Sequence, residues 1–169
     1  MKSLLFFILT IIQFNVSAGE ISKVFGNGVF GTTWGSTLND IKGVFPKGKV
    51  EKYGEIIQFV VKDGRSVLGL KRDKKALIRF AFDSEARLSA VGVYFDGDDF
   101  STLMSKLNTL FGEYTKPNAG GYLVLQWPKD DEVTLSLSLL PSTFSNDTAF
   151  SIEFSGLTKP STSKEQLGF

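Results

Sequence analysis

The chain has 169 residues, of which 19 are lysine or arginine and 18 are aspartate or glutamate, so its formal net charge at pH 7 is +1. A balance this close to neutral gives no general attraction to nucleic acid or to an anionic membrane surface. The chain contains no cysteine and no histidine, which excludes disulfide bonds, cysteine nucleophiles, Ser–His–Asp triads, structural zinc sites and histidine-bound catalytic metals. The metal chemistry that remains for protein ligands is an all-oxygen site for calcium or magnesium.

Residues 1–18 have the pattern of a secretory signal peptide. Lys2 supplies a positive start, positions 4–14 are almost entirely apolar, and small residues precede the expected cleavage site between Ala18 and Gly19. The alternative is an uncleaved membrane anchor, but this apolar run is shorter than the ~20 residues that a spanning helix needs. We therefore expect a soluble, exported mature chain without a membrane span.

The expected location is the bacterial periplasm or the secreted space. Small extracellular domains of eukaryotes usually carry disulfides, and this chain has no cysteine to form them. Gly19 stands where a bacterial lipoprotein would have its anchoring cysteine. Residues 19–157 are long enough for a single domain with its own core, and the polar segment 158–169 is expected to be a flexible tail.

Hydrophobic periodicity predicts the elements of the first half of the chain. They are an extended segment over 24–33, a helix over 37–45, and strands over 55–62, 65–70, 76–82 and 88–95. Asp63-Gly64 is a two-residue hairpin signal between two of these strands. Ser36 or Thr37 is expected to cap the helix, and Pro46 is expected to end it.

The second half repeats this order of elements. A helix is expected over 100–111, followed by strands over 121–127, 132–140 and 148–157. Leu103, Leu107 and Leu110 form the expected apolar stripe of the helix. Asp98 or Asp99 is expected to cap its start, and Gly112 is expected to end it.

The expected fold class is α+β: a curved antiparallel β-sheet with two helices packed on one face, and with the other face partly open. Ser36-Thr37-Leu38 resembles Ser101-Thr102-Leu103, and each triplet lies at the start of a helix that strands follow. A tandem helix-plus-meander repeat, with halves 29–95 and 96–157, accounts for this likeness. The alternative is that two unrelated helices share common start signals.

The start of the first expected helix also resembles known families. A helix that opens with Trp-Gly, a capping threonine and an acidic-aliphatic pair, and that ends in a bulky residue and proline, is similar to small bacterial envelope modules of the BamE/SmpA type and of the β-lactamase-inhibitor-protein type. The matching residues are Trp34, Gly35, Thr37, Asp40, Ile41, Phe45 and Pro46. The resemblance implies protein binding without catalysis, in outer-membrane assembly or in enzyme inhibition. The chain departs from both families, because it lacks the lipoprotein cysteine of the first and the disulfides of the second.

Several residues are candidates for a binding surface. Tryptophan is enriched at binding hot spots, a basic turn can dock an acidic partner, and the irregular segment 141–149 is the best candidate for a contact loop. The candidates are Trp34, Trp127, Phe144, Ser145, Asn146, Lys71, Arg72 and Lys74. Structural roles are the alternatives: a core position for each tryptophan and a solvated turn for the basic residues.

Asp96, Asp98 and Asp99 form the densest carboxylate cluster and are weak candidates for a calcium site. The EF-hand spacing is absent, because the twelfth position counted from Asp96 is Leu107 rather than glutamate. Helix capping is therefore the favoured interpretation. The acidic stretch 130–132 could supply paired carboxylates for acid–base chemistry, but it is expected to be a hairpin turn. No catalytic residue and no cofactor is expected.

Together these features predict an exported, non-catalytic protein-binding module: an inhibitor, an immunity protein or an envelope accessory protein. Its expected partner is another protein of the envelope or the secreted space. One alternative is a carrier or sensor of an apolar ligand such as a lipid or peptide, because the many phenylalanines could line a cavity. Another is a hydrolase that uses only aspartate and glutamate. The strand over 148–157 could also pair with another chain as an edge strand.

Overall fold

The computed structural model describes residues 20–54, 56–141 and 146–157. The segments expected to be a signal peptide and a tail, 1–18 and 158–169, lie outside these residues. Within them the helices are α1 (Glu20–Phe25), α2 (Leu38–Val44), the 3-10 helix η1 (Gly97–Asp99) and α3 (Phe100–Phe111). The strands are β1 (Gly28–Val29), β2 (Thr32–Thr33), β3 (Lys49–Tyr53), β4 (Ile56–Lys62), β5 (Leu77–Phe82), β6 (Leu88–Asp96), β7 (Leu123–Asp130), β8 (Val133–Pro141) and β9 (Asn146–Phe154).

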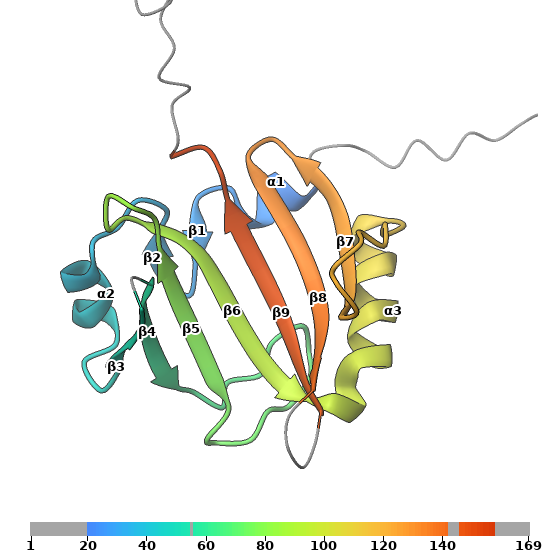
Figure 1. Cartoon of the computed structure of the whole chain (residues 1–169), viewed down its shortest axis with the longest axis horizontal. Coiled ribbons are helices and arrows are strands. Elements are labelled where there is room, and N and C mark those ends of the chain that lie inside the picture. Colours follow the sequence, from blue (N-terminus) through green and yellow to red (C-terminus); the bar gives the residue numbers. More distant parts are fainter. Residues whose placement is uncertain (1–19, 55, 142–145, 158–169) are drawn as a thin grey trace, which may run out of the picture.

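Seven of the strands form one antiparallel sheet in the order β3-β4-β5-β6-β9-β8-β7 (Figure 1). The sheet is open, and β1 and β2 form a separate small hairpin. The α+β class with an antiparallel sheet is therefore confirmed. Helix α2 precedes the meander β3 to β6, helix α3 precedes the meander β7 to β9, and the last strands of the two meanders are neighbours at the centre of the sheet.

The core lies between one face of the sheet and the helices. Alternate strand residues point to this face, so they are buried together with apolar side chains from all three α-helices. The buried residues include Phe59, Phe80, Val91, Val93, Leu135, Leu137, Phe150 and Ile152 from the sheet and Ile21, Ile41, Leu103 and Leu107 from the helices. The sheet layer and the helix layer explain why the sequence contains both the two-residue hydrophobic period of strands and the 3.6-residue period of helices.

Thr37 caps α2, as predicted. The Thr37 hydroxyl accepts a hydrogen bond from the Asp40 N–H at 3.4 Å, and the Asp40 carboxylate accepts one from the Thr37 N–H at 2.8 Å. This reciprocal arrangement is a capping box. The hydrogen bonds from Thr37 hold the pKa of Asp40 below its usual value. Phe45 ends the helix, with its N–H donating to the Ile41 carbonyl.

The start of α3 differs from the expectation. Asp99 occupies the N-cap position, but its side chain makes no capping hydrogen bond, because the chain enters the helix through η1. The apolar stripe also shifts by one residue. Leu103, Leu107 and Phe111 are buried at a spacing of four residues, whereas Leu110 is 53% exposed. Gly112 follows the helix with φ of 82°, a conformation that favours glycine.

The prediction of a hairpin at Asp63-Gly64 is wrong. Strand β4 pairs with β3 and with β5, and the residues between β4 and β5 form a long irregular connection. Asp63 donates its N–H to the Ala76 carbonyl at 2.9 Å, so the connection leaves and re-enters the sheet at one point. Only a single bridge between Val67 and Leu70 remains of the strand expected over 65–70.

Two further expectations are corrected. The segment 24–33 is not extended throughout, because α1 runs to Phe25 and a hairpin turn falls at Phe30-Gly31. The suggestion that the strand over 148–157 could pair with another chain as an edge strand is wrong, because β9 lies between β6 and β8 at the centre of the sheet. The edges of the sheet are β3 and β7.

Candidate functional site

The face of the sheet opposite the core is uncovered. In the part of the chain that the structure describes, no helix crosses this face, which Figure 1 views from the front with the helices behind or beside the sheet. We call it the open face, and it consists of the outward side chains of β3 to β9. At its centre most of these side chains are small: Ala90 and Gly92 on β6, Ala149 and Ser151 on β9, and Thr134, Ser136 and Ser138 on β8. The larger side chains of Tyr94 on β6 and Glu153 on β9 lie on the same face.

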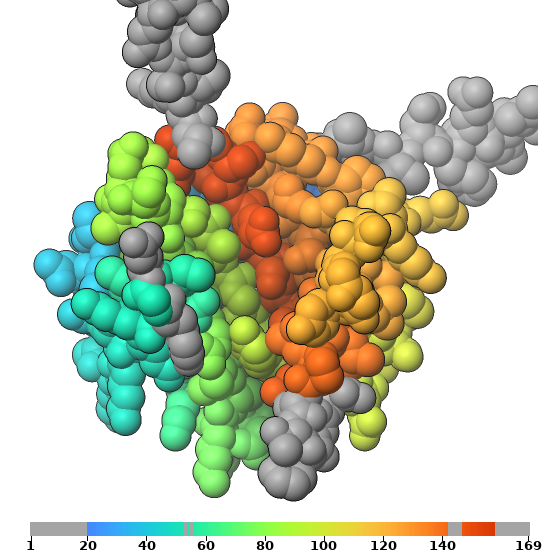
Figure 2. Space-filling model, in the orientation of Figure 1, coloured from blue at the N-terminus to red at the C-terminus, as the bar shows by residue number. Residues whose placement is uncertain are grey.

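Strand register brings the small residues into line. Gly92 pairs with Arg79 on one side and with Ser151 on the other, and Ser151 pairs in turn with Ser136. The next partner outward is Gln126 on β7. Figure 2 shows that the face is hollowed along the central strands, between the flank of β3 and β4 and the chain that leads into β7. The open face is therefore a shallow trough whose floor consists mostly of small side chains.

One wall of the trough is held rigidly. The Arg79 guanidinium donates to the Glu51 carboxylate at 2.9 Å and to the Gln58 amide oxygen at 3.0 Å. It also lies over the ring of Tyr94, with 5.5 Å between the guanidinium carbon and the ring centre. A charged group with this many partners keeps one position, so the wall is preorganised for contact.

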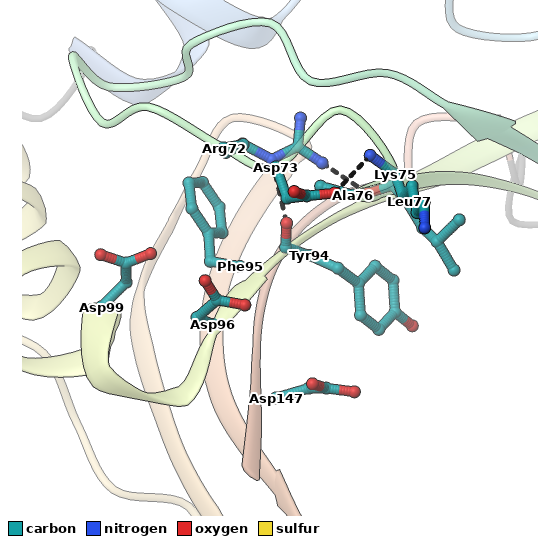
Figure 3. A pocket seen from close by; sticks show the side chains of 10 residues that line it. All are labelled: Arg72, Asp73, Lys75, Ala76, Leu77, Tyr94, Phe95, Asp96, Asp99 and Asp147. Atoms are coloured by element: carbon teal, nitrogen blue, oxygen red, sulfur yellow. Dashed lines mark hydrogen bonds between the residues drawn. The ribbon is translucent and has the colours of Figure 1, made fainter. Parts of the chain in front are cut away.

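An acidic pocket lies at one end of the central strands (Figure 3), with a volume of about 290 Å³. Asp96 and Asp147 face each other across β6 and β9, and Asp99 lies nearby on η1. Burial, and then the charges of Asp96 and Asp98, raise the pKa of Asp99. Among the described residues, no cation lies within salt-bridge distance of the carboxylates of Asp96, Asp98, Asp99 and Asp147. Arg72 and Lys75 also line the pocket, so its negative charge is only partly offset, by two cations that form no ion pair with these aspartates.

Arg72 forms part of the opposite side of this pocket and has a structural role. It is 9% exposed, and its guanidinium donates to the carbonyls of Tyr94, Leu77 and Asp63 at 2.9, 2.7 and 2.9 Å. Burial lowers its pKa below the ordinary value for arginine. These bonds attach the long connection to β5 and β6. Lys71, Arg72 and Lys74 were expected to form an exposed docking patch. Arg72 is instead buried, while the two lysines are exposed.

Both tryptophans are packed. Trp127 is fully buried and donates its indole N–H to the Gly112 carbonyl at 2.9 Å. Trp34 is half-buried, donates to the Phe25 carbonyl at 2.7 Å, and stacks on Phe154. The candidates Phe144 and Ser145 lie outside the described residues, and Asn146 is the first residue of β9. The best-placed binding surface is therefore the open face, which no single sequence motif identifies.

An apolar cavity of about 340 Å³, open to solvent, lies on the other side of the sheet, beside the core. Its walls come from three separate stretches of the chain and from the central strands. They are Val24, Phe25, Gly28, Val29, Phe30, Val67, Leu68, Val93, Phe150 and Ile152. The phenylalanine content suggested such a cavity, but the sequence could not show which residues meet there, because they are distant in the chain.

The described residues contain no group of three or more aspartate or glutamate side chains placed to hold a metal ion, and Asp96, Asp98 and Asp99 do not form one. The acidic stretch 130–132 lies at the turn between β7 and β8, and Asp130 accepts a hydrogen bond from the Ser22 N–H at 2.9 Å. None of the helices in the described segments is long and apolar enough to cross a membrane.

No family model, curated protein or solved structure matches the chain. The functional argument therefore depends on the open face, the acidic pocket and the apolar cavity.

Proposed function

We propose that the protein is an exported, non-catalytic binding module of the bacterial envelope, and that a folded protein partner docks on its open face. The observation that carries this proposal is the trough of small side chains on an uncovered seven-stranded sheet. An inhibitor, an immunity protein or an envelope accessory factor would act in this way.

The size of the open face suits a protein rather than a small substrate. Strands lie about 4.8 Å apart and rise about 3.4 Å per residue, so the face covers roughly 750 Å². A standard protein–protein interface buries about 800 Å² on each partner. A sheet face with glycine, alanine and serine at its centre also admits close approach of a helix or loop.

The chemistry of the face supports binding without catalysis. Ser136 and Ser151 place hydroxyl groups at the centre of the trough, but the chain has no histidine to act as their base. The charged residue of the wall, Arg79, already has carboxylate and amide partners. These groups can align a partner, and the acidic pocket at the end of the trough can receive its lysine or arginine side chain.

The test is affinity capture from a periplasmic extract at moderate salt, followed by a binding constant with the purified captured protein. The variant Ser151→Arg places a large charged side chain on the trough floor without disturbing the core. The matched control is Ser101→Arg on the exposed start of α3. We expect one dominant protein that the wild type and Ser101→Arg retain and that Ser151→Arg loses. Capture of nothing, or equal capture by both variants, would overturn the proposal.

A further inference from the structure

We propose that the helix side of the sheet carries a second binding site, which takes a single-chain amphiphile with an anionic head group. The apolar cavity would hold the hydrocarbon chain, and a neighbouring basic cavity would hold the head group. This site lies on the opposite side of the sheet from the open face. It would add the carrier or sensor role for an apolar ligand to protein binding.

The apolar cavity offers no hydrogen-bonding side chain. Nine of its ten lining residues have aliphatic or aromatic side chains, and the tenth is Gly28. The cavity has a volume of about 340 Å³ and opens to solvent, so it is a surface pocket rather than an enclosed void. Volumes of about 300 to 1,000 Å³ are typical of ligand pockets. Val24, 57% exposed, lies at the rim and leaves the cavity accessible.

Two strained turns form part of the cavity wall. The turns Phe30-Gly31 and Leu68-Gly69 each connect a bridged pair of residues, and all four φ angles are positive. Turns of this geometry prefer asparagine or glycine at the first position, yet here that position holds phenylalanine or leucine. Both side chains line the cavity. Two of the four non-glycine residues with positive φ in the described part of the chain thus line the cavity, and backbone strain of this kind is concentrated at ligand sites.

The basic cavity lies between the turn Leu68-Gly69 and α3. It is a shallow surface depression of about 390 Å³, lined by Leu68, Ser105, Lys106, Thr109 and Leu110, of which Lys106 is the one charged residue. Leu68 therefore forms a wall of both cavities. A side chain added at Gly69 would come within 3.6 Å of the Lys106 ammonium, so this charge lies beside the shared turn.

Lys106 supplies the charge that selects the ligand. No carboxylate within the described residues lies within salt-bridge distance of its ammonium group. The hydroxyls of Ser105 and Thr109 line the same cavity. An apolar chamber that adjoins an ammonium group complements a hydrocarbon chain that ends in an anion. An extended peptide fits less well, because its amide groups would lose their hydrogen bonds in the apolar chamber.

The first test is titration calorimetry of the purified protein with decanoate, below its critical micelle concentration. Each methylene buried should improve the dissociation constant about fourfold, so decanoate should bind roughly 15-fold more tightly than octanoate. Methyl NMR should show the largest shifts at Val24, Val29 and Ile152 of the cavity, and none at Val124 on the open face. Absence of saturable binding, or shifts confined to the open face, would overturn the proposal.

The second test reverses the charge at the proposed head-group site. Lys106→Glu should weaken decanoate binding at least tenfold and should strengthen binding of decyltrimethylammonium. The matched control is Lys42→Glu, which makes the same change on the exposed side of α2 and should alter neither. If Lys106→Glu and Lys42→Glu bind both amphiphiles like the wild type, Lys106 has no role in recognition and the proposal fails.

A third variant separates ligand binding from folding. Leu68→Asn removes an apolar wall and places at the turn a residue that tolerates positive φ. We expect the melting temperature to be unchanged or higher while the affinity for decanoate falls; unchanged affinity would contradict the assignment. The two sites are independent, so Ser151→Arg should leave decanoate binding intact and Lys106→Glu should leave partner capture intact. Failure of one proposal is thereby distinguished from failure of the other.

Discussion

Asp96 and Asp147 are directly paired across the two central strands, at the end of the sheet that carries the acidic pocket. Like charges in this position destabilise an antiparallel pair. Neither carboxylate forms an ion pair, although Arg72 and Lys75 line the same pocket, so both remain available to a cationic group of a binding partner.

The first prediction concerns this pair. Asp147→Asn should raise the free energy of unfolding by about 0.5 kcal/mol, because it removes the repulsion between the two carboxylates. If the pocket receives a cationic side chain of the partner, the same variant should weaken partner binding. Urea denaturation and a binding titration measure the two effects. Lower stability together with unchanged binding would show that the pair is structural.

Arg72 should be essential for the long connection between β4 and β5. Arg72→Met would leave carbonyls of Tyr94, Leu77 and Asp63 without their donor. A buried group that loses its partner costs about 1 to 3 kcal/mol, so we expect a loss of about 3 kcal/mol in urea denaturation. Lys71→Met, at the exposed neighbouring position, should change stability by less than about 0.5 kcal/mol. Equal effects of the two substitutions would contradict the assigned role.

The two similar triplets at the helix starts provide a matched test of capping. Thr37→Ala removes the hydroxyl that caps α2 and should cost about 1 kcal/mol. Thr102→Ala changes the equivalent residue in α3, which lies inside the helix and is exposed. It should be nearly neutral, because alanine has the higher helix propensity. Thermal denaturation distinguishes the two outcomes, and a large loss for Thr102→Ala would indicate an unseen structural role.

Stability should fall on acidification. A hydrogen bond from the Arg65 side chain lowers the pKa of Asp63, and hydrogen bonds from Thr37 lower that of Asp40. A carboxyl whose pKa is lower in the folded state stabilises the fold above its unfolded pKa, and this contribution is lost as the pH falls through the folded value. Urea midpoints should therefore be nearly constant from pH 7 to about 5 and should decline below about pH 4.

A matched variant assigns part of this pH dependence. Asp63→Asn should be less stable than the wild type at pH 7, and its stability should decline less on acidification, because residue 63 no longer gains a proton. Asp99 should have the opposite effect on stability. Its pKa is raised in the folded state, so protonation of Asp99 on acidification stabilises the fold. A steeper decline for Asp63→Asn than for the wild type would contradict the assignment.

The sequence predicted the elements whose determinants are local. Helix α2 carries its own cap and stop, and β5, β6 and β8 alternate strongly, so each was placed to within a residue or two. The strand predicted after Asp63 is wrong, because that prediction depended on the two residues Asp63-Gly64 alone. The true path depends on Arg72, whose hydrogen bonds reach residues in β5 and β6.

The candidate sites were harder to predict than the fold. The sequence predicted that one sheet face would be partly open. The trough on that face depends on the register of Gly92, Ser151 and Ser136, and register depends on strand order. The tryptophans were candidates by residue type, yet local hydrogen bonds and stacking hold them inside the fold. The sequence did not identify Lys106 as a candidate site residue. Its proposed role depends on the turn Leu68-Gly69, which lies about forty residues earlier in the sequence and beside Lys106 in the fold.

The measurement that tests the central claim most directly is the dissociation constant of the captured, purified partner for the wild type, Ser151→Arg and Ser101→Arg. If the open face is the binding surface, Ser151→Arg should raise the dissociation constant at least tenfold, while Ser101→Arg should match the wild type. Equal constants for all three proteins, with the fold of each verified by its melting temperature, would show that the partner binds elsewhere.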